Sequence, residues 1–300
     1  MNSKLLNRQS VKAEALRLGF SACGLAPAEP VQEPHASHFL QWIQKGCQAD
    51  MHYMENHIAM RLDPRLLMPE VRTIISVALN YYPPKQAPGI SMYAQGQDYH
   101  EVMRARLLRL MQCIHAEGRC FVDTAPILER YWAWRAGLGW IGRNTLMILP
   151  RHGSTFFLGE LFVTTEADSY DTPLDYTCGQ CRRCFDACPM GALTETGIDA
   201  HRCLSYLTIE HRGPLPEGLQ LQDCFYGCDR CQKACPHLQQ ATPTSVEAFL
   251  PSEELLDMNP SKWKHLTLEQ YQHLFKGSAV KRAKFNALKR NIDACTFHSE

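Results

Sequence analysis

Apolar and polar residues alternate along the first half of the chain in patterns that predict both helices and strands. Residues 10–18 have helical spacing and are followed by Gly19, a helix-stop signal. Residues 73–79 (TIISVAL) are rich in β-branched side chains, as is typical of a buried strand. From 98 to 115 we expect a helix of about five turns that opens with a capping-box pattern, D-Y-H-E, and has one apolar face.

Shorter elements follow this helix and complete the domain. The pattern predicts a strand at 120–122, a helix at 127–136, and strands near 145–149 and 156–163. We expect the second helix to have Pro126 at its first position and Ala125 as its cap. Helices and strands mixed in this way predict an α+β fold.

Differences in composition divide the chain into three parts. Residues 166–176 are acidic, contain a proline and lack periodicity, so we interpret them as a linker. Nine of the fourteen cysteines lie between 178 and 235, and the chain beyond 241 is helical and polar. We therefore expect a first domain at 1–165, a cysteine-rich domain at 166–240 and a helical C-terminal segment at 241–300.

Overall composition narrows the setting in which the protein works. Of its 300 residues, 45% are hydrophobic and 21% are charged, which is typical of a globular protein. The formal net charge is zero, so any attraction to nucleic acid must come from a local patch. With no signal-peptide pattern and no apolar run of about 18–20 residues, we expect a cytoplasmic protein without membrane contact. In that reducing compartment fourteen cysteines indicate metal binding or redox chemistry rather than disulfides.

The first cysteine motif is the run found in bacterial ferredoxins. It reads Cys178-x2-Cys181-x2-Cys184-x3-Cys188-Pro189. In ferredoxins with two clusters, the first three cysteines bind one cluster and the fourth binds the other. The motif therefore predicts a bacterial-ferredoxin-like module with two 4Fe-4S clusters.

A second, incomplete motif supports the same module. It reads Cys228-x2-Cys231-x3-Cys235-Pro236 and lacks the leading cysteine of a full copy. Cys224 and Cys203 are both candidates for the missing ligand. A structural zinc ribbon is the alternative, but it does not require two C-x3-C-P endings.

If the last cysteine of each motif binds the cluster of the other motif, the ligands of each cluster can be assigned. The first cluster would take Cys178, Cys181, Cys184 and Cys235. The second would take Cys188, Cys228, Cys231 and one of the two candidates. Because a cluster pair carries electrons and does little other chemistry, we expect the N-terminal domain to hold whatever is reduced.

Asp123 is the candidate for a reacting group in the first domain. It lies in the segment V-D-T-A-P, after a predicted strand and before a predicted helix, where functional groups are common. A helix cap is the alternative, but Pro126 has no N–H for Asp123 to cap. The nearby G-L-G-W-I-G (137–142) follows a helix, so it is not a dinucleotide fingerprint.

A basic stretch near the C-terminus is the local patch that nucleic acid would require. Residues 276–290 contain six Lys or Arg and no acidic residue. As a helix, this stretch would present a basic face to phosphates, although a solvated helix surface gives the same pattern.

Several strings in this chain resemble the epoxyqueuosine reductase family, cobalamin-dependent enzymes that complete queuosine on tRNA. The resemblance runs from Arg61 to about Arg290 and includes the first cysteine motif. The other matching strings are R-L-D-P-R (61–65), Q-D-Y-H (97–100), V-D-T-A-P-I-L-E-R (122–130), R-A-G-L-G-W-I-G-R-N-T (135–145), R-C-L-S-Y-L-T-I-E-H-R-G (202–213) and Y-G-C-D-R-C-Q-K-A-C-P (226–236).

This resemblance implies a nitroreductase-like cobalamin-binding domain, a ferredoxin-like module and a short helical C-terminal tail. It favours Cys203 as the last ligand of the second cluster and places Asp123 at the family's proposed proton donor. The positions that it implies for cobalamin contacts are Arg61, Asp123, Asn144, Met147, Leu158 and Ser205. The positions suggested for tRNA are Arg212, Lys281, Arg282 and Lys284.

The implied reaction is reduction of epoxyqueuosine to queuosine at the wobble position of tRNA. Electrons from an external low-potential donor would pass through both clusters to cobalamin, whose cobalt does the difficult chemistry. Asp123 would protonate the opened epoxide if burial beside the corrin raises its pKa enough to keep it protonated. We expect a monomer that binds the anticodon loop.

The sequence shows one departure from the longer members of the family and is also compatible with two rival functions. Longer family members continue into helical HEAT-like repeats, and this chain resembles the short form that lacks most of them. Reductive dehalogenases also pair cobalamin with two clusters, but they typically carry a twin-arginine export signal that this N-terminus lacks. A simple electron-transfer protein would leave the large first domain without a cofactor.

Overall fold

A four-stranded antiparallel sheet forms the centre of the N-terminal half. In the computed structural model, which describes residues 5–150 and 152–296, the strand order is β1-β2-β6-β3. The strands are β1 (Ala22–Pro27), β2 (Thr73–Asn80), β6 (Phe156–Val163) and β3 (Gly118–Phe121). Every neighbouring pair of strands is antiparallel, and the helices pack on the faces of this sheet. This arrangement confirms the α+β prediction.

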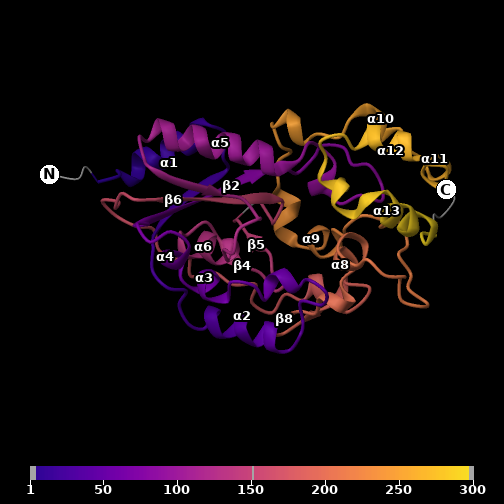
Figure 1. Cartoon of the computed structure of the whole chain (residues 1–300), viewed down its shortest axis with the longest axis horizontal. Coiled ribbons are helices and arrows are strands. Elements are labelled where there is room, and N and C mark those ends of the chain that lie inside the picture. Colours follow the sequence, from indigo (N-terminus) through magenta and orange to yellow (C-terminus); the bar gives the residue numbers. More distant parts are fainter. Residues whose placement is uncertain (1–4, 151, 297–300) are drawn as a thin grey trace.

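Helices cover both faces of this sheet, which explains why β2 is apolar throughout. Helices α1 (Arg8–Arg17) and α5 (Tyr99–Cys113) pack on one face, and α6 (Glu129–Arg135) packs on the other (Figure 1). Seven of the eight β2 residues are buried. A strand buried on both faces has no polar side, so its sequence shows a continuous apolar run.

The structure confirms one predicted helix start in part and contradicts the other. Asp98 does cap α5, accepting from the His100 N–H, but its own N–H donates to the Gly277 carbonyl. A capping box with Glu101 would need that N–H, so the C-terminal segment has replaced it. The prediction of Ala125 as the cap of α6 is wrong, because α6 begins at Glu129 with Leu128 as its cap.

Short elements connect the sheet to the rest of the chain. In the N-terminal half they are α2 (His35–Gln44), α3 (Ile58–Leu62), α4 (Pro64–Leu67), β4 (Trp140–Ile141) and β5 (Met147–Ile148). The cysteine-rich part contains α7 (Arg183–Asp186), β7 (Leu193–Thr194), β8 (Gly197–Ile198), α8 (Leu204–Ile209) and α9 (Arg230–Lys233). The C-terminal part contains α10 (Glu253–Leu256), α11 (Pro260–Lys264), α12 (Leu268–Leu274) and α13 (Lys284–Asp293).

The segment predicted as a linker is fastened to the N-terminal domain. The Asp171 carboxylate accepts from Lys12 and from the Leu25 N–H, at 2.8 Å and 2.9 Å. Leu6 forms a parallel bridge with Ala167. Because its backbone and carboxylates are paired in this way, the segment is an integral part of the domain surface.

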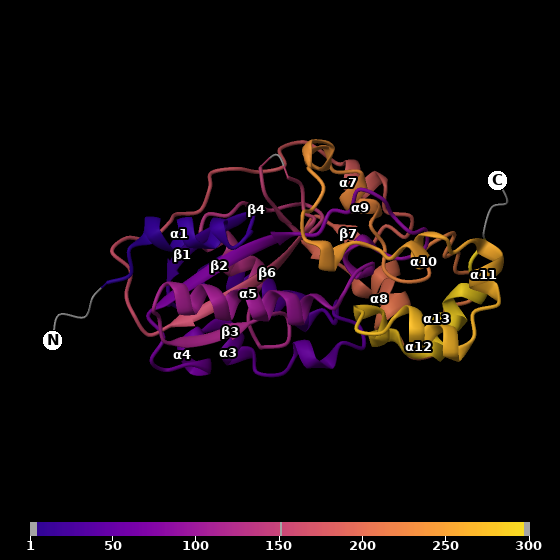
Figure 2. The ribbon, with the colours of Figure 1, turned by 90° about the horizontal axis from the view of Figure 1, so that it is seen from above.

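Hydrophobic cores extend across both expected domain boundaries. One core joins Ala94 of the first part, Leu221 of the cysteine-rich part and Trp263 of the C-terminal part. Another places Val246 and Phe249 with the residues above the sheet. Helices α11 to α13 lie at the opposite end of the molecule from α1 (Figure 2). The boundaries at 165 and 240 stay a prediction, as does the nitroreductase-like character of the first domain.

No helix in the described ranges 5–150 and 152–296 is long and apolar enough to cross a bilayer.

Candidate functional site

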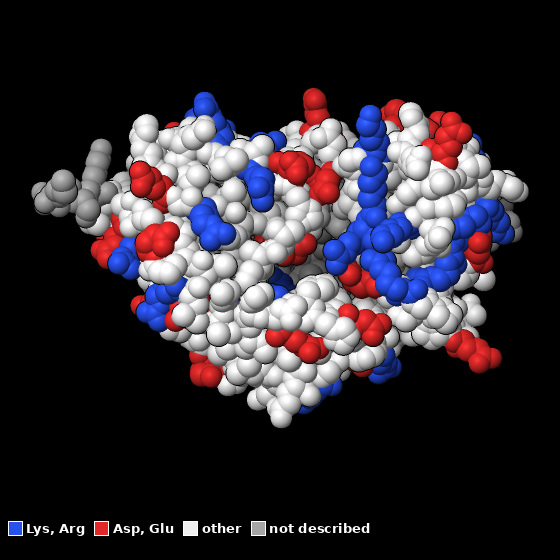
Figure 3. All heavy atoms as spheres, in the orientation of Figure 1, with Lys and Arg blue, Asp and Glu red and all other residues white. Residues whose placement is uncertain are grey.

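A large cavity lies where the three parts of the chain meet. Its volume is about 1020 Å³, at the upper end of the range for small-molecule and cofactor sites. Helix α2, the loop from Asp123 to α6, the β7–β8 hairpin and the segment before α13 all contribute to its wall. Figure 3 shows the face hollowed near its centre, with Lys and Arg side chains gathered on one side.

The wall of this cavity is mainly aromatic and polar. Its aromatic and histidine side chains are His35, His38, Phe39, Trp42, Tyr53, His57, Tyr93, Tyr99, His100, Tyr131 and Tyr226. Its charged side chains are Arg61, Asp98, Asp123, Glu129, Arg130, Glu210, Lys281 and Arg282. Such a lining suits a large flat ligand with polar groups at its edge.

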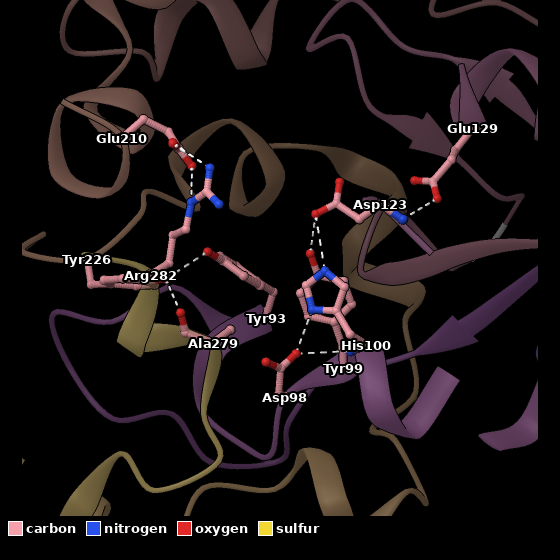
Figure 4. A network of polar contacts seen from close by, with 10 residues as sticks. All are labelled: Tyr93, Asp98, Tyr99, His100, Asp123, Glu129, Glu210, Tyr226, Ala279 and Arg282. Atoms are coloured by element: carbon pink, nitrogen blue, oxygen red, sulfur yellow. Dashed lines mark hydrogen bonds and ion pairs between the residues drawn. The ribbon is translucent and has the colours of Figure 1, made fainter. Parts of the chain in front are cut away.

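Asp123 lies on this wall in a strained turn just beyond β3. Its φ of 57° is in the left-handed region, and the Thr124 N–H donates to the Val122 carbonyl at 2.6 Å. The Asp123 N–H donates to Glu129 at 2.6 Å, which fastens the turn to the first residue of α6 (Figure 4). Backbone strain of this kind is often found at functional sites.

Two side chains from the start of α5 contact the Asp123 carboxylate. The Tyr99 hydroxyl donates to Oδ2 at 2.6 Å, and His100 Nε2 lies 3.6 Å from the same oxygen. His100 also contacts Asp98 through Nδ1, at 2.7 Å. The imidazole therefore lies between two carboxylates, as Figure 4 shows.

These contacts set the charge of the site. Interaction with His100 and then the Tyr99 hydrogen bond lower the pKa of Asp123, although burial opposes them. The same contact with Asp123, together with Asp98, raises the pKa of His100. Burial by itself does raise the pKa of Asp123, but the contacts with His100 and Tyr99 outweigh it, so the net shift is downward. The effect of burial beside a bound corrin on this pKa stays a prediction. The proton of this pair is held on His100, where two carboxylates stabilise it.

The cysteines predicted to bind the first cluster line a smaller pocket near the cavity. That pocket is lined by Cys178, Cys181, Cys184 and Cys235 together with Asn144 and His237. Trp140, from the G-L-G-W-I-G string, donates its indole N–H to Cys178 Sγ at 3.4 Å. Hydrogen bonds to ligating sulfurs are one means by which proteins tune cluster potentials.

The four cysteines predicted for the second cluster also lie near one another. Burial raises the pKa of Cys231 to about 12, and Cys203 and Cys188 add to this shift. Cys203 is also close enough to Cys228 for its charge to oppose the lowering of the Cys228 pKa. Cys224 lies beside Cys228 as well, within hydrogen-bonding contact. The structure thus places both candidate ligands near the second motif.

Single-ion sites have a different geometry from these cysteine groups. Within residues 5–150 and 152–296, no three His, Cys, Asp or Glu side chains are close enough to hold one metal ion. The cysteines of a four-iron cube bind four separate corners, so they stand farther apart than the ligands of a single zinc.

The six positions suggested for cobalamin do not all lie at the large cavity. Arg61 and Asp123 line it, and Arg61 is held by donation to the carbonyls of Asn56 and Tyr53. Asn144 lines the smaller pocket, and its Nδ2 has no partner among the described residues. The remaining three are outside the described lining of the cavity: Met147, Leu158 and Ser205. Their contacts stay predictions.

The basic residues suggested for tRNA differ in how available they are. Arg212 donates to the carbonyls of Ile209 and Arg282, so its guanidinium fastens the segment before α13. Arg282 donates twice to Glu210. Lys281 and Lys284 are exposed, and Lys281 lines the cavity. The two lysines are therefore the better placed for phosphate.

Sequence reasoning did not single out Tyr99, His100, Glu129 or Trp140. All four lie within strings that carried the family resemblance, but nothing in their spacing indicated a contact. Asp123 contacts Tyr99 and His100 only because the end of β3 and the beginning of α5 lie at the same edge of the cavity.

Fold and site together define a class: an oxidoreductase in which an iron–sulfur module adjoins a large cofactor-sized cavity. Residues 177–237 match the family model described as "4Fe-4S double cluster binding domain". Residues 61–124 match "Epoxyqueuosine reductase QueG, DUF1730".

Full-length relatives identify the family. The chain is 41% identical to the epoxyqueuosine reductase of Cellulophaga algicola, over 98% of this chain and 99% of the relative. It is 40% identical to that of Leadbetterella byssophila, over 95% and 96% of the two chains. The chain belongs to the epoxyqueuosine reductase family.

A solved structure agrees with this assignment. The crystal structure of epoxyqueuosine reductase with a tRNA-Tyr epoxyqueuosine-modified tRNA stem loop superimposes with a TM-score of 0.86 at 27% identity. The match covers 95% of this chain and 79% of that one.

Proposed function

We propose that this protein reduces epoxyqueuosine to queuosine at the wobble position of tRNA, with cobalamin in the large cavity and electrons relayed through two 4Fe-4S clusters. The observation that carries this proposal is the Asp123–His100–Tyr99 group on the wall of a cavity that adjoins the cluster module. It supports the proposal of a proton donor and an electron source at the same site. The family assignment supplies the substrate class.

Residues of the cavity fit a cobalamin-sized group. A volume of about 1020 Å³ suits a macrocycle, and aromatic, charged and hydroxyl-bearing side chains line the wall of this cavity. Aromatic faces from α2 and hydroxyl groups of Tyr53 and Tyr93 would pack against the ring and meet its amide edge. When bound, cobalamin would supply a low-valent, nucleophilic cobalt centre.

The chain's own contribution is to hold and deliver a proton. Removal of the epoxide oxygen consumes two electrons and two protons and yields an alkene and water. Opening the ring leaves an alkoxide, which needs an acid within hydrogen-bond reach. Because the proton of this pair is held on His100, the two residues act as one acid: Asp123 meets the oxygen, and the His100 proton reaches that oxygen by way of the Asp123 carboxyl group.

Cluster ligation follows the crossed arrangement of the two motifs. We assign Cys178, Cys181, Cys184 and Cys235 to the first cluster and Cys188, Cys203, Cys228 and Cys231 to the second. The proximity of these groups supports the assignment. An external low-potential donor would reduce the clusters. We further propose that the protein is a monomer in the cytoplasm.

The anticodon loop would enter the cavity from the side of the segment before α13. Lys281 in that segment and Lys284 at the start of α13 are exposed, whereas Arg212 and Arg282 use their donors within the protein. Single-stranded loops are recognised by splayed bases, stacking and phosphate contacts. Tyr53, beneath Arg282, is an exposed aromatic face at this entrance.

Replacing both lysines by alanine should weaken binding of an anticodon stem loop by roughly tenfold. The salt dependence of binding should also fall by about one unit of slope for each lysine that contacts a phosphate. Fluorescence anisotropy over a range of salt concentrations measures both quantities. Lys85→Ala, at an exposed lysine away from the cavity, is the matched control. Equal slopes for the double variant and the parent protein would remove these lysines from the RNA site.

The function itself is tested by anaerobic reconstitution with iron, sulfide and cobalamin. We expect about eight irons per chain, one bound cobalt, and turnover of epoxyqueuosine tRNA monitored by nucleoside mass spectrometry. Eight irons without cobalamin or turnover would leave an electron-transfer protein. Zinc in place of iron would overturn the cluster assignment as well.

A further inference from the structure

Beneath Asp123 lie two carboxyl groups that the proposed reaction has not used, one fully buried and one partly buried at the wall of the cavity. Glu160 lies on β6 and is fully buried, and both of its carboxyl oxygens lack a hydrogen-bond donor among the described residues. Glu129 is the first residue of α6, which packs on the same face of the sheet. The two carboxyl groups are in side-chain contact with each other.

Contact between two carboxyl groups is stable only with a proton between them. A carboxylate is an acceptor without a donor, so two ionised groups would repel each other, and burial of Glu160 keeps water from screening that repulsion on its side. With one proton, the same contact becomes a strong O–H···O hydrogen bond. The missing donor at Glu160 is thus supplied by the acid proton itself.

Few charged groups face this pair. Asp123, Arg130 and Tyr99 face Glu129, and Glu129 faces Glu160. The Arg130 guanidinium donates to the Thr145 carbonyl and not to either glutamate. From β2, Ser76 lies directly opposite Glu160, and its hydroxyl also lacks a partner among the described residues. Directly opposed side chains on antiparallel strands are within reach of each other.

The pair is connected to the reacting group through the backbone. Glu129 accepts the Asp123 N–H at 2.6 Å, and this bond holds Asp123 in its left-handed conformation. A carboxyl group that must accept from Asp123 with one oxygen needs its other oxygen fixed. The proton shared with Glu160 would fix it.

We propose that Glu129 and Glu160 share one proton and that this pair is the positioning device for Asp123, holding the turn that aims its carboxylate into the cavity. The inference rests on the proposed function, since it gives Asp123 the role of proton donor. Glu129 and Glu160 act through Asp123 and need no contact with the substrate.

The pair predicts a dependence on pH with a defined sign. Burial, followed by the charge of Asp123, raises the pKa of Glu129 from 4.5 to about 8. Burial, followed by Glu129, raises the pKa of Glu160 well above its ordinary value. The contribution to stability is therefore complete below about pH 4.5 and is lost as the pH rises through about 8. Above that pH a second negative charge forms beneath Asp123 and loosens its turn.

Glu160→Gln and Glu160→Ala test this inference as a matched pair. The amide of Gln still donates to Glu129, whereas Ala leaves Glu129 without a partner. We expect the Gln variant to retain turnover within about threefold and the Ala variant to lose roughly tenfold to hundredfold. Glu117→Gln, at an exposed position beside β3, is the control. In the parent protein we expect turnover to fall as the pH rises through about 8, and in the Gln variant we expect this fall to be absent. The same fall in turnover in both proteins would overturn the proposal.

Infrared spectroscopy tests the shared proton without turnover. The parent protein near neutral pH should show the C=O stretch of a buried, protonated carboxylic acid, and Glu160→Gln should lack it. Absence of that band in the folded parent protein overturns the proposal. If the band is present but the parent protein does not turn over epoxyqueuosine tRNA, the proposed function fails and the shared proton stands.

Discussion

Asp123→Asn should retain iron, cobalamin and fold but lose turnover by roughly 10²–10⁴-fold, the usual contribution of a general acid. Asparagine is among the few residues that adopt a left-handed φ easily, so the turn at 57° should persist. Its side chain can still accept from the Tyr99 hydroxyl. What it cannot do is exchange a proton with His100. Single-turnover assays with epoxyqueuosine tRNA, beside iron and cobalt analysis, measure the effect.

A second consequence of this substitution concerns His100. The pKa of His100 is raised mainly by Asp123, so removing that charge should lower it towards the ordinary value. The protonated imidazole would then persist only at lower pH. Titration of His100 by NMR checks this shift independently of turnover. Asp175→Asn, at an exposed carboxylate outside the cavity, is the control, and unchanged turnover in Asp123→Asn would remove Asp123 from the mechanism.

Cys203→Ala should reduce the iron content from about eight to about four atoms per chain and abolish turnover. Cys203 lies near Cys188, Cys228 and Cys231, the other members of its proposed set. Loss of one thiolate leaves one corner of the cube to solvent, where the cluster is readily lost. Electron transfer between the two clusters would then stop.

Cys224→Ala is the matched variant for this experiment. Cys224 is also beside Cys228, so proximity to the motif alone does not distinguish the two cysteines. We expect Cys224→Ala to keep about eight irons and near-normal turnover. The reverse result, with iron lost in Cys224→Ala and kept in Cys203→Ala, would exchange their roles. Iron analysis and EPR of the reduced protein provide the readout.

The sequence by itself determined several of the helices and strands and indicated the iron–sulfur chemistry. The β-branched run at 73–79 became β2, and the pattern at 98–115 became α5, because apolar periodicity reflects burial directly. The spacing of the cysteines is a local property as well. Three thiolates around one cube must lie on a short loop, so the motif Cys178-x2-Cys181-x2-Cys184 could be interpreted without a fold.

The resemblance to the family predicted more of the residues at the cavity than the spacing of residues did. Asp123 and Arg61 were placed at the cavity through resemblance, and the structure locates both on its wall. Arg212 and Arg282 were chosen because they are basic, but charge in a sequence does not reveal what a side chain pairs with. One donates to backbone carbonyls and the other to Glu210.

Only the tertiary structure decided the charge state and surroundings of Asp123. Burial alone suggested a raised pKa, but His100 and Tyr99 lie against the carboxylate and lower it. The Glu129–Glu160 contact joins residues 31 positions apart on a helix and a strand, as their sequence numbers give. Local sequence determines where helices and strands form, whereas a pKa depends on the neighbours that packing brings within a few ångströms.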